Sequence, residues 1–372
     1  MILESIRIGL IGVGQRGMKT LERYAFIPHA QVCAVADIHE ERLTMANNLL
    51  KEQGREAAKE YSGKHAWKKM CEAKDINLIY ICTDWSSHTQ MAVYAMQQGK
   101  DVAVEVPAAT AVEECWQLVD TAEHTGRHCF MTENCCYDRF ALATLEMKRR
   151  GLFGELTHCE GAYIHSLNIA EHDWMKQTYA KHGGNPYPTH GLGPIGWLLN
   201  LHRGDRLDYL VSITSQPGQI NTTLLKTVKG KSIILQLDVC TYRPYNRLQT
   251  ICGTKGFSQK YPVPTLQFGE TKVLVGDKAL EEAKNYEISD ASLRWLQGQK
   301  LGVPNEMNYA MDSRLIHCLR HGLPLDIDVY DAAEWSCIAE LSQISAQEGS
   351  RPIEIPDFTR GRWKEFSPHK FF

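Results

Sequence analysis

The sequence lacks several features that would assign it to a class at once. It contains no apolar run of the ~18 residues that a membrane-spanning helix needs. It also contains no basic tract. Its 41 Lys and Arg residues are offset by 44 Asp and Glu residues, which gives a formal net charge of -3. We therefore expect neither a membrane nor a nucleic acid as a partner.

The cysteines lack the spacing of a metal site. None of the 12 cysteines forms a Cys-x-x-Cys pair, and Cys135 and Cys136 are adjacent. Scattered thiols of this kind are usually small core side chains in a reducing compartment, so we expect no metal. The first residues also lack the basic start and cleavage site of a secretion signal. We expect a cytoplasmic protein, or a periplasmic one if a leader has been removed.

The 372 residues exceed one ordinary hydrophobic core, and the pattern of elements changes near residue 134. In residues 1–133, apolar strands alternate with helical patterns, which predicts an α/β Rossmann domain with a parallel sheet. The expected strands are residues 6–11, 31–36, 78–82, 102–104 and 128–132, and the expected helices are residues 16–26, 89–98 and 112–125.

Residues 134–372 are expected to form an α+β substrate-binding domain with a mainly antiparallel sheet. The expected strands are residues 156–164, 207–215, 222–228, 232–239 and 248–252, with a hairpin turn at Lys229-Gly230. Helices are expected at residues 140–150, 309–320 and 332–347, and residues 260–305 are expected to be a long loop with a short helix.

A Gly-x-Gly-x-x-Gly run stands at residues 12–17, after the first expected strand and before the first expected helix. In this context, Gly12 permits the tight turn, Gly14 lets a pyrophosphate approach the backbone, and Gly17 permits close packing of helix and strand. Asp37 closes the second strand, where a carboxylate binds ribose hydroxyls and repels a 2′-phosphate. The pattern predicts NAD rather than NADP, against the alternative of a glycine turn that binds nothing.

Ligands of such sheets lie at the carboxyl ends of the strands, so the later strand ends extend the predicted cofactor site. His88 either contacts the cofactor or caps the next helix. Glu105 either lies at the nicotinamide end or is a carboxylate satisfied by backbone amides. The full predicted cofactor set is Gly12, Gly14, Gln15, Arg16, Gly17, Asp37, Thr83, Trp85, His88, Glu105 and Asn134.

A second group of candidate residues lies in the Gly-, Pro-, Tyr- and His-rich stretch 182–200, where a helix is expected to begin near Pro194. This stretch can hold Tyr187 and His190 rigidly, and His190 is the best acid/base candidate because imidazole titrates near neutral pH. Tyr137 is the second candidate, since a phenol beside a positively charged nicotinamide loses its proton more readily. Taken singly, each is better explained as a packed aromatic residue or a satisfied histidine, but both lie in segments that are expected to face the nicotinamide.

The glycine fingerprint, "YICTDWSSH" at residue 80 and "GKDVAVEVPAA" at residue 99 resemble the Gfo/Idh/MocA superfamily, whose members oxidise or reduce sugars and cyclitols with NAD(P). Ordinary members carry Glu-Lys-Pro with a catalytic lysine, and Val106 stands in that lysine's place here. They also carry an Asp-x-Gly-x-His run, which is replaced here by Thr189-His190-Gly191-Leu192-Gly193. The resemblance also implies a homo-oligomer, a dimer or higher, formed through the open sheet face.

One branch shares these replacements: glycoside hydrolase family 109, typified by α-N-acetylgalactosaminidases. The matching segments include "EVPAA", "ENCCYDR", "YPTHGLGP", "RGDRLDYLVS" and "GLPLDIDVYDAAEWS". The resemblance implies a redox-neutral hydrolysis in which a hydride passes from sugar C3 to tightly bound NAD, the C1 substituent is eliminated across C1–C2, water adds, and the hydride returns.

The resemblance also assigns roles to residues. Tyr137 and His190 become the acid/base pair, Tyr187 and Glu105 position sugar and nicotinamide, and Tyr309 and Trp174 line the sugar pocket. The chain departs from the branch where Met175 replaces an arginine after Trp174, and again across residues 304–309. We therefore expect a glycoside that differs from α-N-acetylgalactosaminide. The alternatives are a sugar or cyclitol dehydrogenase with net NADH turnover, and a non-catalytic sensor of NAD or sugar.

Overall fold

The computed structural model describes residues 4–166, 173–215 and 220–368. The chain divides into two compact units. Unit 1 comprises residues 1–109, 113–132 and 294–332, and unit 2 comprises residues 110–112, 133–293 and 333–372. The expected boundary at residue 133 is thus one point where the chain leaves unit 1, and residues 294–332 return to it. None of the described helices is long and apolar enough to cross a membrane.

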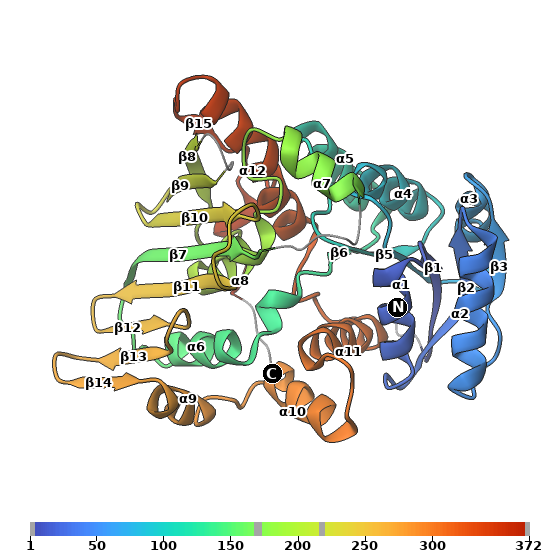
Figure 1. The fold of residues 1–372 in the computed structure, drawn as a ribbon, viewed down its shortest axis with the longest axis horizontal. Coiled ribbons are helices and arrows are strands. Elements are labelled where there is room, and N and C mark those ends of the chain that lie inside the picture. The colour runs from blue at the N-terminus through green and yellow to red at the C-terminus, as the bar shows by residue number, and fades with distance from the viewer. Residues whose placement is uncertain (1–3, 167–172, 216–219, 369–372) are drawn as a thin grey trace. The chain divides into compact units, whose positions relative to one another are not determined.

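Unit 1 is built on a six-stranded parallel sheet in the order β3-β2-β1-β4-β5-β6, which confirms the predicted Rossmann domain (Figure 1). Its strands are β1 (Ile6–Ile11), β2 (Ala30–Asp37), β3 (Lys59–Ser62), β4 (Leu78–Ile81), β5 (Asp101–Val104) and β6 (Cys129–Met131). Its helices are α1 (Gln15–Tyr24), α2 (Glu40–Glu52), α3 (Ala66–Cys71), α4 (Trp85–Gln97), α5 (Val112–Thr125) and α11 (Glu306–His321). Strands β4 and β5 are buried throughout, which agrees with the apolar sequence of β4 and of residues 102–104 in β5.

A buried ion pair explains why α11, so late in the sequence, belongs to unit 1. The Nε of Arg23 in α1 donates to Oδ2 of Asp312 in α11 over 2.7 Å, and the Tyr80 hydroxyl donates to Oδ1 of the same carboxylate over 3.3 Å. Both charged side chains are at most 2% exposed. Because an unpaired charge in this position would be strongly destabilising, the pair ties α11 to α1 and to β4.

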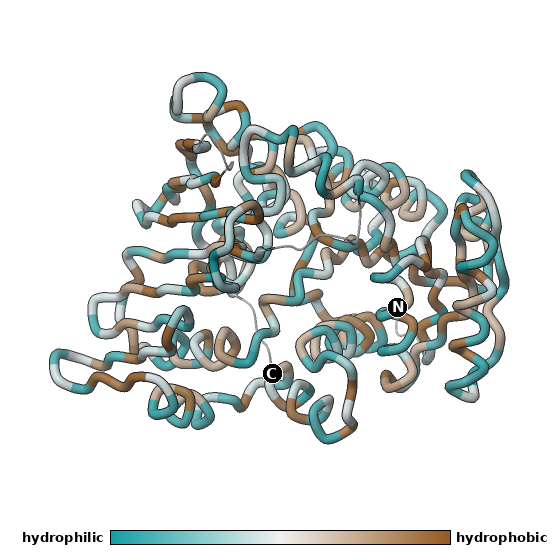
Figure 2. Tube along the Cα trace, viewed as in Figure 1, coloured by the Kyte–Doolittle hydropathy of each residue, from teal (hydrophilic) through white to brown (hydrophobic). Residues whose placement is uncertain are grey.

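Unit 2 contains a nine-stranded sheet in the order β14-β13-β12-β11-β7-β10-β9-β8-β15, which is antiparallel except between β7 and β10. The strands are β7 (Leu156–Ile164), β8 (Leu207–Thr214), β9 (Asn221–Thr227), β10 (Ser232–Asp238), β11 (Asn246–Gly253), β12 (Gly256–Gln259), β13 (Thr265–Phe268), β14 (Lys272–Val275) and β15 (Ile353–Glu354). Hydrophobic residues recur along the strands of both sheets, whereas the connecting turns are mostly hydrophilic (Figure 2).

The helices of unit 2 include α6 (Arg139–Arg149), α7 (Asp173–Lys181), α8 (Thr189–Leu199) and α9 (Asp277–Lys284), with short 3-10 turns η1 (Asn134–Tyr137) and η2 (Arg362–Lys364). The chain passes between the units within α10 (Asp290–Leu301) and α12 (Val329–Gln347). Helix α8 packs on β7 and β11 and contacts η1. This contact brings together two segments that carry predicted site residues.

Two predictions about secondary structure were wrong. Residues 260–305 are not a loop with one helix, because they contain the β13–β14 hairpin, α9 and α10. Both strands are only four residues long, β13 is half-buried and β14 is mostly exposed, so the apolar period that marks a strand is weak. Helix α8 begins at Thr189 rather than near Pro194, which lies inside it.

Candidate active site

The glycine loop of unit 1 has a backbone that other residues could not adopt without strain or collision. Gly12 has a φ of 84°, and a Cβ at this position would lie 2.7 Å from the carbonyl oxygen of Cys82. A Cβ at Gly17 would lie 1.9 Å from the carbonyl oxygen of Gly12, so the third glycine permits α1 to begin directly beside the turn. The loop therefore has the shape that a pyrophosphate at a helix N-terminus requires.

Asp37 closes β2 and holds the glycine loop in place. Its Oδ2 accepts a hydrogen bond from the Val13 N–H at 2.9 Å, and its Oδ1 accepts one from the His39 N–H at 3.0 Å. Each carboxylate oxygen has a second acceptor position, which fits the ribose hydroxyls of NAD. The guanidinium of Arg42 lies 3.8 Å from Oδ1 and is 45% exposed, a point that bears on cofactor choice below.

Glu105 follows β5 and is engaged by a residue of the glycine loop. The Nε of Arg16 donates to its Oε1 over 2.7 Å, while the Glu105 N–H donates to the Ile81 carbonyl and so extends the sheet. Within the part of the chain that the structure describes, the carboxylate pairs with a guanidinium, rather than with the backbone amides of the alternative interpretation. Val106 beside it is 4% exposed, so the position of the superfamily's lysine is occupied here by a buried apolar side chain.

His88 joins two strand ends of unit 1. It lies within α4, which begins at Trp85, and its ring is fully buried. Its Nδ1 lies 2.8 Å from the Pro107 carbonyl oxygen and its Nε2 lies 3.1 Å from the Thr83 carbonyl oxygen. The ring therefore braces the segments after β4 and β5, and a direct contact of His88 with the cofactor stays a prediction.

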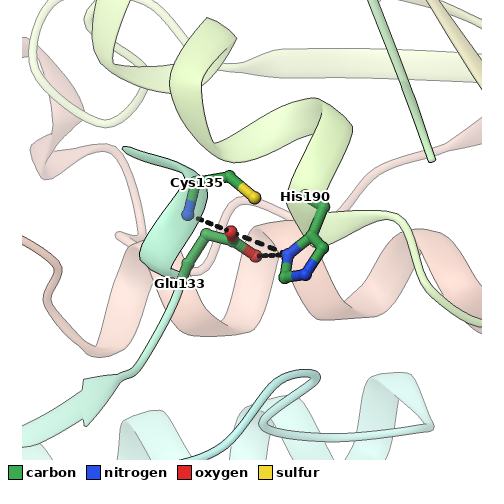
Figure 3. A group of neighbouring side chains, drawn as sticks. All are labelled: Glu133, Cys135 and His190. Atoms are coloured by element: carbon green, nitrogen blue, oxygen red, sulfur yellow. Dashed lines mark hydrogen bonds and ion pairs between the residues drawn. The ribbon is translucent and has the colours of Figure 1, made fainter. Parts of the chain in front are cut away.

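The predicted acid/base residue His190 is paired with a buried carboxylate in unit 2 (Figure 3). Its Nδ1 lies 2.8 Å from both Oε1 and Oε2 of Glu133, and its Nε2 lies 3.3 Å from the Tyr187 hydroxyl. The Glu133 side chain is 0% exposed and that of His190 is 13% exposed. Glu133 was not among the predicted site residues, although its place at a strand end beside Asn134 could have indicated a site residue.

Glycines make this pairing possible. A Cβ at Gly193 would lie 2.8 Å from the Cγ of Glu133, and a Cβ at Gly161 in β7 would lie 2.2 Å from the carbonyl oxygen of Gly191. The glycine-rich sequence that appeared to exclude a helix start instead permits the first turns of α8 to approach β7 and η1 closely. That approach places His190 against Glu133.

The two partners shift each other's protonation. Burial alone would lower the pKa of His190, but Cys135 and Glu133 outweigh it and raise that pKa to about 10. Burial would raise the pKa of Glu133, but His190 outweighs that effect and holds it below its usual range. At neutral pH the pair is therefore an imidazolium and a carboxylate, and His190 can donate a proton before it can accept one.

The thiol of Cys135 completes a group that has the composition of a metal site. Ligand atoms of Glu133, Cys135 and His190 all lie within 4.8 Å of one another. However, Nδ1 of His190 is in direct hydrogen-bond contact with both carboxylate oxygens at 2.8 Å. Since zinc ligands stand ~2.0–2.3 Å from the ion, metal binding would require this contact to open. The geometry is that of a hydrogen-bonded acid/base group.

Aromatic rings surround His190, and most of them were not predicted. The ring centroid of Tyr163, in β7, lies 5.1 Å from that of His190, 5.0 Å from that of Tyr187 and 6.5 Å from that of Tyr245. Tyr137, in η1, is fully buried, and its ring meets Trp197 of α8 edge-on at 5.3 Å. Tyr137 and His190 thus lie on two contacting elements of unit 2, η1 and the start of α8, and Tyr187 precedes α8 with its hydroxyl against His190.

The remaining predicted residues are less informative. Asn134 is buried in η1, and Trp174 is half-buried in α7. Tyr309 lies in α11 of unit 1 and is 1% exposed; its ring lies 2.7 Å from the point where Gly298 would carry a Cβ. Nothing in this environment distinguishes Tyr309 from a core residue, and its sugar contact stays a prediction.

The same fold occurs in solved NAD-binding oxidoreductases. An oxidoreductase from Agrobacterium radiobacter, solved with NAD+, L-tartaric acid and magnesium, matches with a TM-score of 0.73 at 18% identity over 94% of this chain and 98% of that one. An inositol dehydrogenase homologue from Azotobacter vinelandii, solved with NADH and myo-inositol, matches with a TM-score of 0.71 at 17% identity over 95% and 98%. Residues 6–133 match the family model for the oxidoreductase family, NAD-binding Rossmann fold.

Within that class, the chain belongs to glycosyl hydrolase family 109, as its motifs predicted. Residues 166–217 and 213–365 match the model for the glycosyl hydrolase 109 C-terminal domain. A glycosyl hydrolase family 109 protein 2 of Phocaeicola vulgatus is 52% identical, over 97% of this chain and 96% of its own length. An alpha-N-acetylgalactosaminidase of Bacteroides fragilis is 51% identical, over 98% and 94%. The family assignment confirms the prediction of an NAD-dependent glycosidase over the two alternatives.

Proposed function

We propose that this chain hydrolyses a glycoside without net consumption of NAD, with His190 and Tyr137 as its acid/base groups. The observation that carries the proposal is the buried Glu133–His190 pair, with Nε2 of His190 directed at the Tyr187 hydroxyl. Val106 supports it further, since a chain without the superfamily's lysine must move protons through other groups. NAD, when bound, supplies an acceptor for a hydride from sugar C3 and later returns that hydride.

The acid/base groups have a reversible task. The C3 hydroxyl proton leaves as the sugar is oxidised and returns as it is reduced, and the C2 proton leaves and returns in the same way. Because each step is reversed within one cycle, two groups suffice. Glu133 keeps His190 charged at rest, so the C3 hydroxyl proton would pass to Tyr137, acting as a phenolate base, and return from it. His190 would donate its proton through Nε2 to the departing C1 oxygen and take up the C2 proton in its place, and both transfers run backward as water adds.

The cofactor is held by unit 1 in this proposal, and it stays bound between turnovers. The glycine loop would face the pyrophosphate, Asp37 the ribose, and the Arg16–Glu105 pair the remainder of the dinucleotide. Because NAD is regenerated in each cycle, exchange with solution is unnecessary. Mass spectrometry of purified protein tests this point: NAD should copurify, and protein that hydrolyses glycosides only with added NAD would contradict it.

The sugar is proposed to be related to, but distinct from, α-N-acetylgalactosaminide. The Bacteroides fragilis relative supports an N-acetylated or similarly substituted hexose. Met175 and residues 304–309 depart from the pattern that accompanies that substrate, which supports a changed preference. A panel of aryl glycosides tests the proposal: cleavage with no accumulation of NADH is expected, and accumulation of NADH in step with sugar oxidation would establish a net dehydrogenase instead.

We also propose a cytoplasmic homo-oligomer. Buried free thiols such as Cys71, Cys129 and Cys159 suit a reducing compartment. Cell fractionation tests the location, and recovery from the periplasm alone would contradict it.

Exposed apolar side chains on β8 and β9 suit an oligomer surface.

A further inference from the structure

Arg247 stands in an irregular stretch of β11. The two following residues, Leu248 and Gln249, both have a φ of 55°, a backbone angle that residues other than glycine rarely adopt. The pairing of β11 with β7 also shifts register there. The Tyr261 N–H donates to the Leu248 carbonyl at 3.2 Å and the Lys260 N–H to the Gln249 carbonyl at 3.3 Å. The irregular backbone thus holds Arg247 beside Lys260 and Tyr261, away from a regular strand position.

The charges at this place do not balance. Nη2 of Arg247 donates to Oδ2 of Asp138 over 2.7 Å, and the Lys260 ammonium pairs with the same oxygen. The other oxygen of Asp138 accepts from the Phe140 and Ala141 N–H groups at the start of α6. One carboxylate therefore serves two cations, and the Arg247 side chain is only 5% exposed. A buried excess positive charge calls for a further anionic or strongly polar oxygen.

Arg247 also has a donor to spare. Its Nε–H is buried and has no hydrogen-bond partner among the residues that the structure describes. Nη2, by contrast, also donates to the Tyr261 hydroxyl at 3.3 Å. Buried donors without a partner are rare because they lose hydration without compensation. The donor and the excess charge are independent observations, and both point to an oxygen acceptor supplied from outside the chain.

Arg247 is connected to the acid/base group by a chain of aromatic rings. The Arg247 guanidinium lies 5.7 Å from the centre of the Tyr261 ring, which is 5.9 Å from that of Tyr245. Tyr245 lies 6.5 Å from Tyr163, whose ring is 5.1 Å from that of His190. Tyr245 is 44% exposed, so this row of rings reaches solvent. Cys135 lies within electrostatic range of both His190 and Arg247. A sugar with its reacting carbons near His190 can therefore direct an exocyclic substituent toward Arg247.

We propose that Arg247 is a specificity-determining residue that binds an sp² oxygen on an exocyclic substituent of the sugar, either an acetamido carbonyl or a carboxylate. The inference rests on the proposed glycosidase function, whose sugar it specifies. An acetamido carbonyl or a carboxylate is a stronger hydrogen-bond acceptor for the guanidinium than the hydroxyl of an unsubstituted hexose, so Arg247 separates substituted sugars from unsubstituted ones.

The test compares two variants that each alter one of the two cations beside Asp138 but differ at the guanidinium. Arg247→Lys keeps a cation for Asp138 and removes the Nε–H donor, and Lys260→Met removes the other cation and leaves the guanidinium intact. The substrates are three matched aryl glycosides of galactose type: N-acetylated, uronate and unsubstituted. Arg247→Lys should raise KM by about tenfold for the N-acetylated or the uronate glycoside. The kcat values, and KM for the unsubstituted glycoside, should change by less than about twofold. Lys260→Met should change all three alike.

Binding of the three free sugars to the NAD-loaded protein, measured by calorimetry, keeps this test separate from the glycosidase proposal. If the wild-type protein cleaves none of the glycosides but Arg247→Lys abolishes a preference for N-acetylgalactosamine or galacturonate, the role of Arg247 stands and the proposed activity fails. An equal loss for all three sugars in Arg247→Lys, the same selective loss in Lys260→Met, or no preference in the wild type would each overturn the inference.

Discussion

At the scale of single residues, Glu133 decides how His190 works. Glu133→Gln keeps the size of the side chain but removes the charge that helps to raise the pKa of His190 to about 10. Without it, burial lowers that pKa, so the imidazolium is lost at lower pH. We expect kcat to fall by about 10² or more at neutral pH, with the alkaline limb of the pH–kcat profile displaced to lower pH.

A profile of kcat against pH for Glu133→Gln and Glu133→Asp checks this prediction. The aspartate variant keeps the charge and should recover part of the alkaline activity. An alkaline limb at the same pH in the wild type and Glu133→Gln would show that this carboxylate does not control the His190 proton.

Asp37 decides between the two dinucleotides. Asp37→Asn retains an acceptor for the Val13 N–H but loses the charge that favours ribose hydroxyls over a 2′-phosphate. The Arg42 guanidinium, which lies 3.8 Å from the Asp37 Oδ1 in the wild type, can then bind that phosphate. We expect NAD affinity to fall by about tenfold or more while NADP affinity rises, as measured by calorimetry on protein stripped of cofactor.

The double variant Asp37→Asn/Arg42→Ala is the control for Arg42. It should lose NAD affinity as the single variant does, yet gain little for NADP. Equal NADP affinity in the single and double variants would show that Arg42 does not bind the 2′-phosphate.

At the scale of elements, Asp138 joins the start of α6 to β11 and to the segment after β12. Although burial favours its neutral form, Lys260 and Arg247 hold the pKa of Asp138 well below its usual range. A lowered carboxyl pKa stabilises the fold above the unfolded-state value of about 4, and this contribution is lost as the pH falls toward the folded-state value. Asp138→Asn leaves two cations without their partner and should cost about 3 kcal/mol at neutral pH.

Thermal denaturation at neutral pH and at about pH 3 measures this effect. The difference in Tm between the wild type and Asp138→Asn should shrink on acidification, because the unfolded wild-type chain takes up a proton at Asp138 that the folded chain does not. Asp75→Asn is a suitable control, since that exposed carboxylate pairs with an exposed Arg7 and should contribute little at either pH. A pH-independent difference for Asp138→Asn would contradict the charge interpretation.

Some helices and strands could be predicted from the sequence, and others could not. Helix α5 was predicted at its observed bounds, and five strands of the Rossmann sheet were predicted within one or two residues, since local apolar period and propensity determine them. Strand β3 was not predicted, because its four residues are polar and mostly exposed. The β13–β14 hairpin was missed because its strands are four residues long and half exposed. The helical start of α8 was missed because its glycines serve contacts with β7 and η1, which no local pattern reveals.

The candidate site divides in the same way. His190, Tyr187 and Tyr137 were found by their chemistry and their place after predicted elements. Glu133 was not, because its meaning depends on a contact with a residue 57 positions away. Tyr163 and Arg247 belong to strands whose inward faces could be inferred only once the sheet order was known.

At the scale of the whole molecule, the open face of the second sheet is the expected oligomer surface. Ile213 on β8 and Leu224 on β9 are 61% and 52% exposed, and the strand pairing places both on one face. Ile213→Glu combined with Leu224→Lys should give a smaller species in light scattering with the Tm of the isolated chain preserved. An unchanged mass would place the oligomer contact elsewhere.

The central claim concerns the whole reaction, which proceeds without net redox change through oxidation at C3 and loss of the C2 proton. The most direct measurement is hydrolysis of a cleavable aryl glycoside in D2O, followed by NMR of the released sugar and absorbance of NADH. We predict deuterium at C2, hydrogen retained at C3, and no accumulation of NADH. A released sugar with no deuterium at C2 would establish direct hydrolysis, and NADH formed in proportion to product would establish a dehydrogenase; either result would contradict the account.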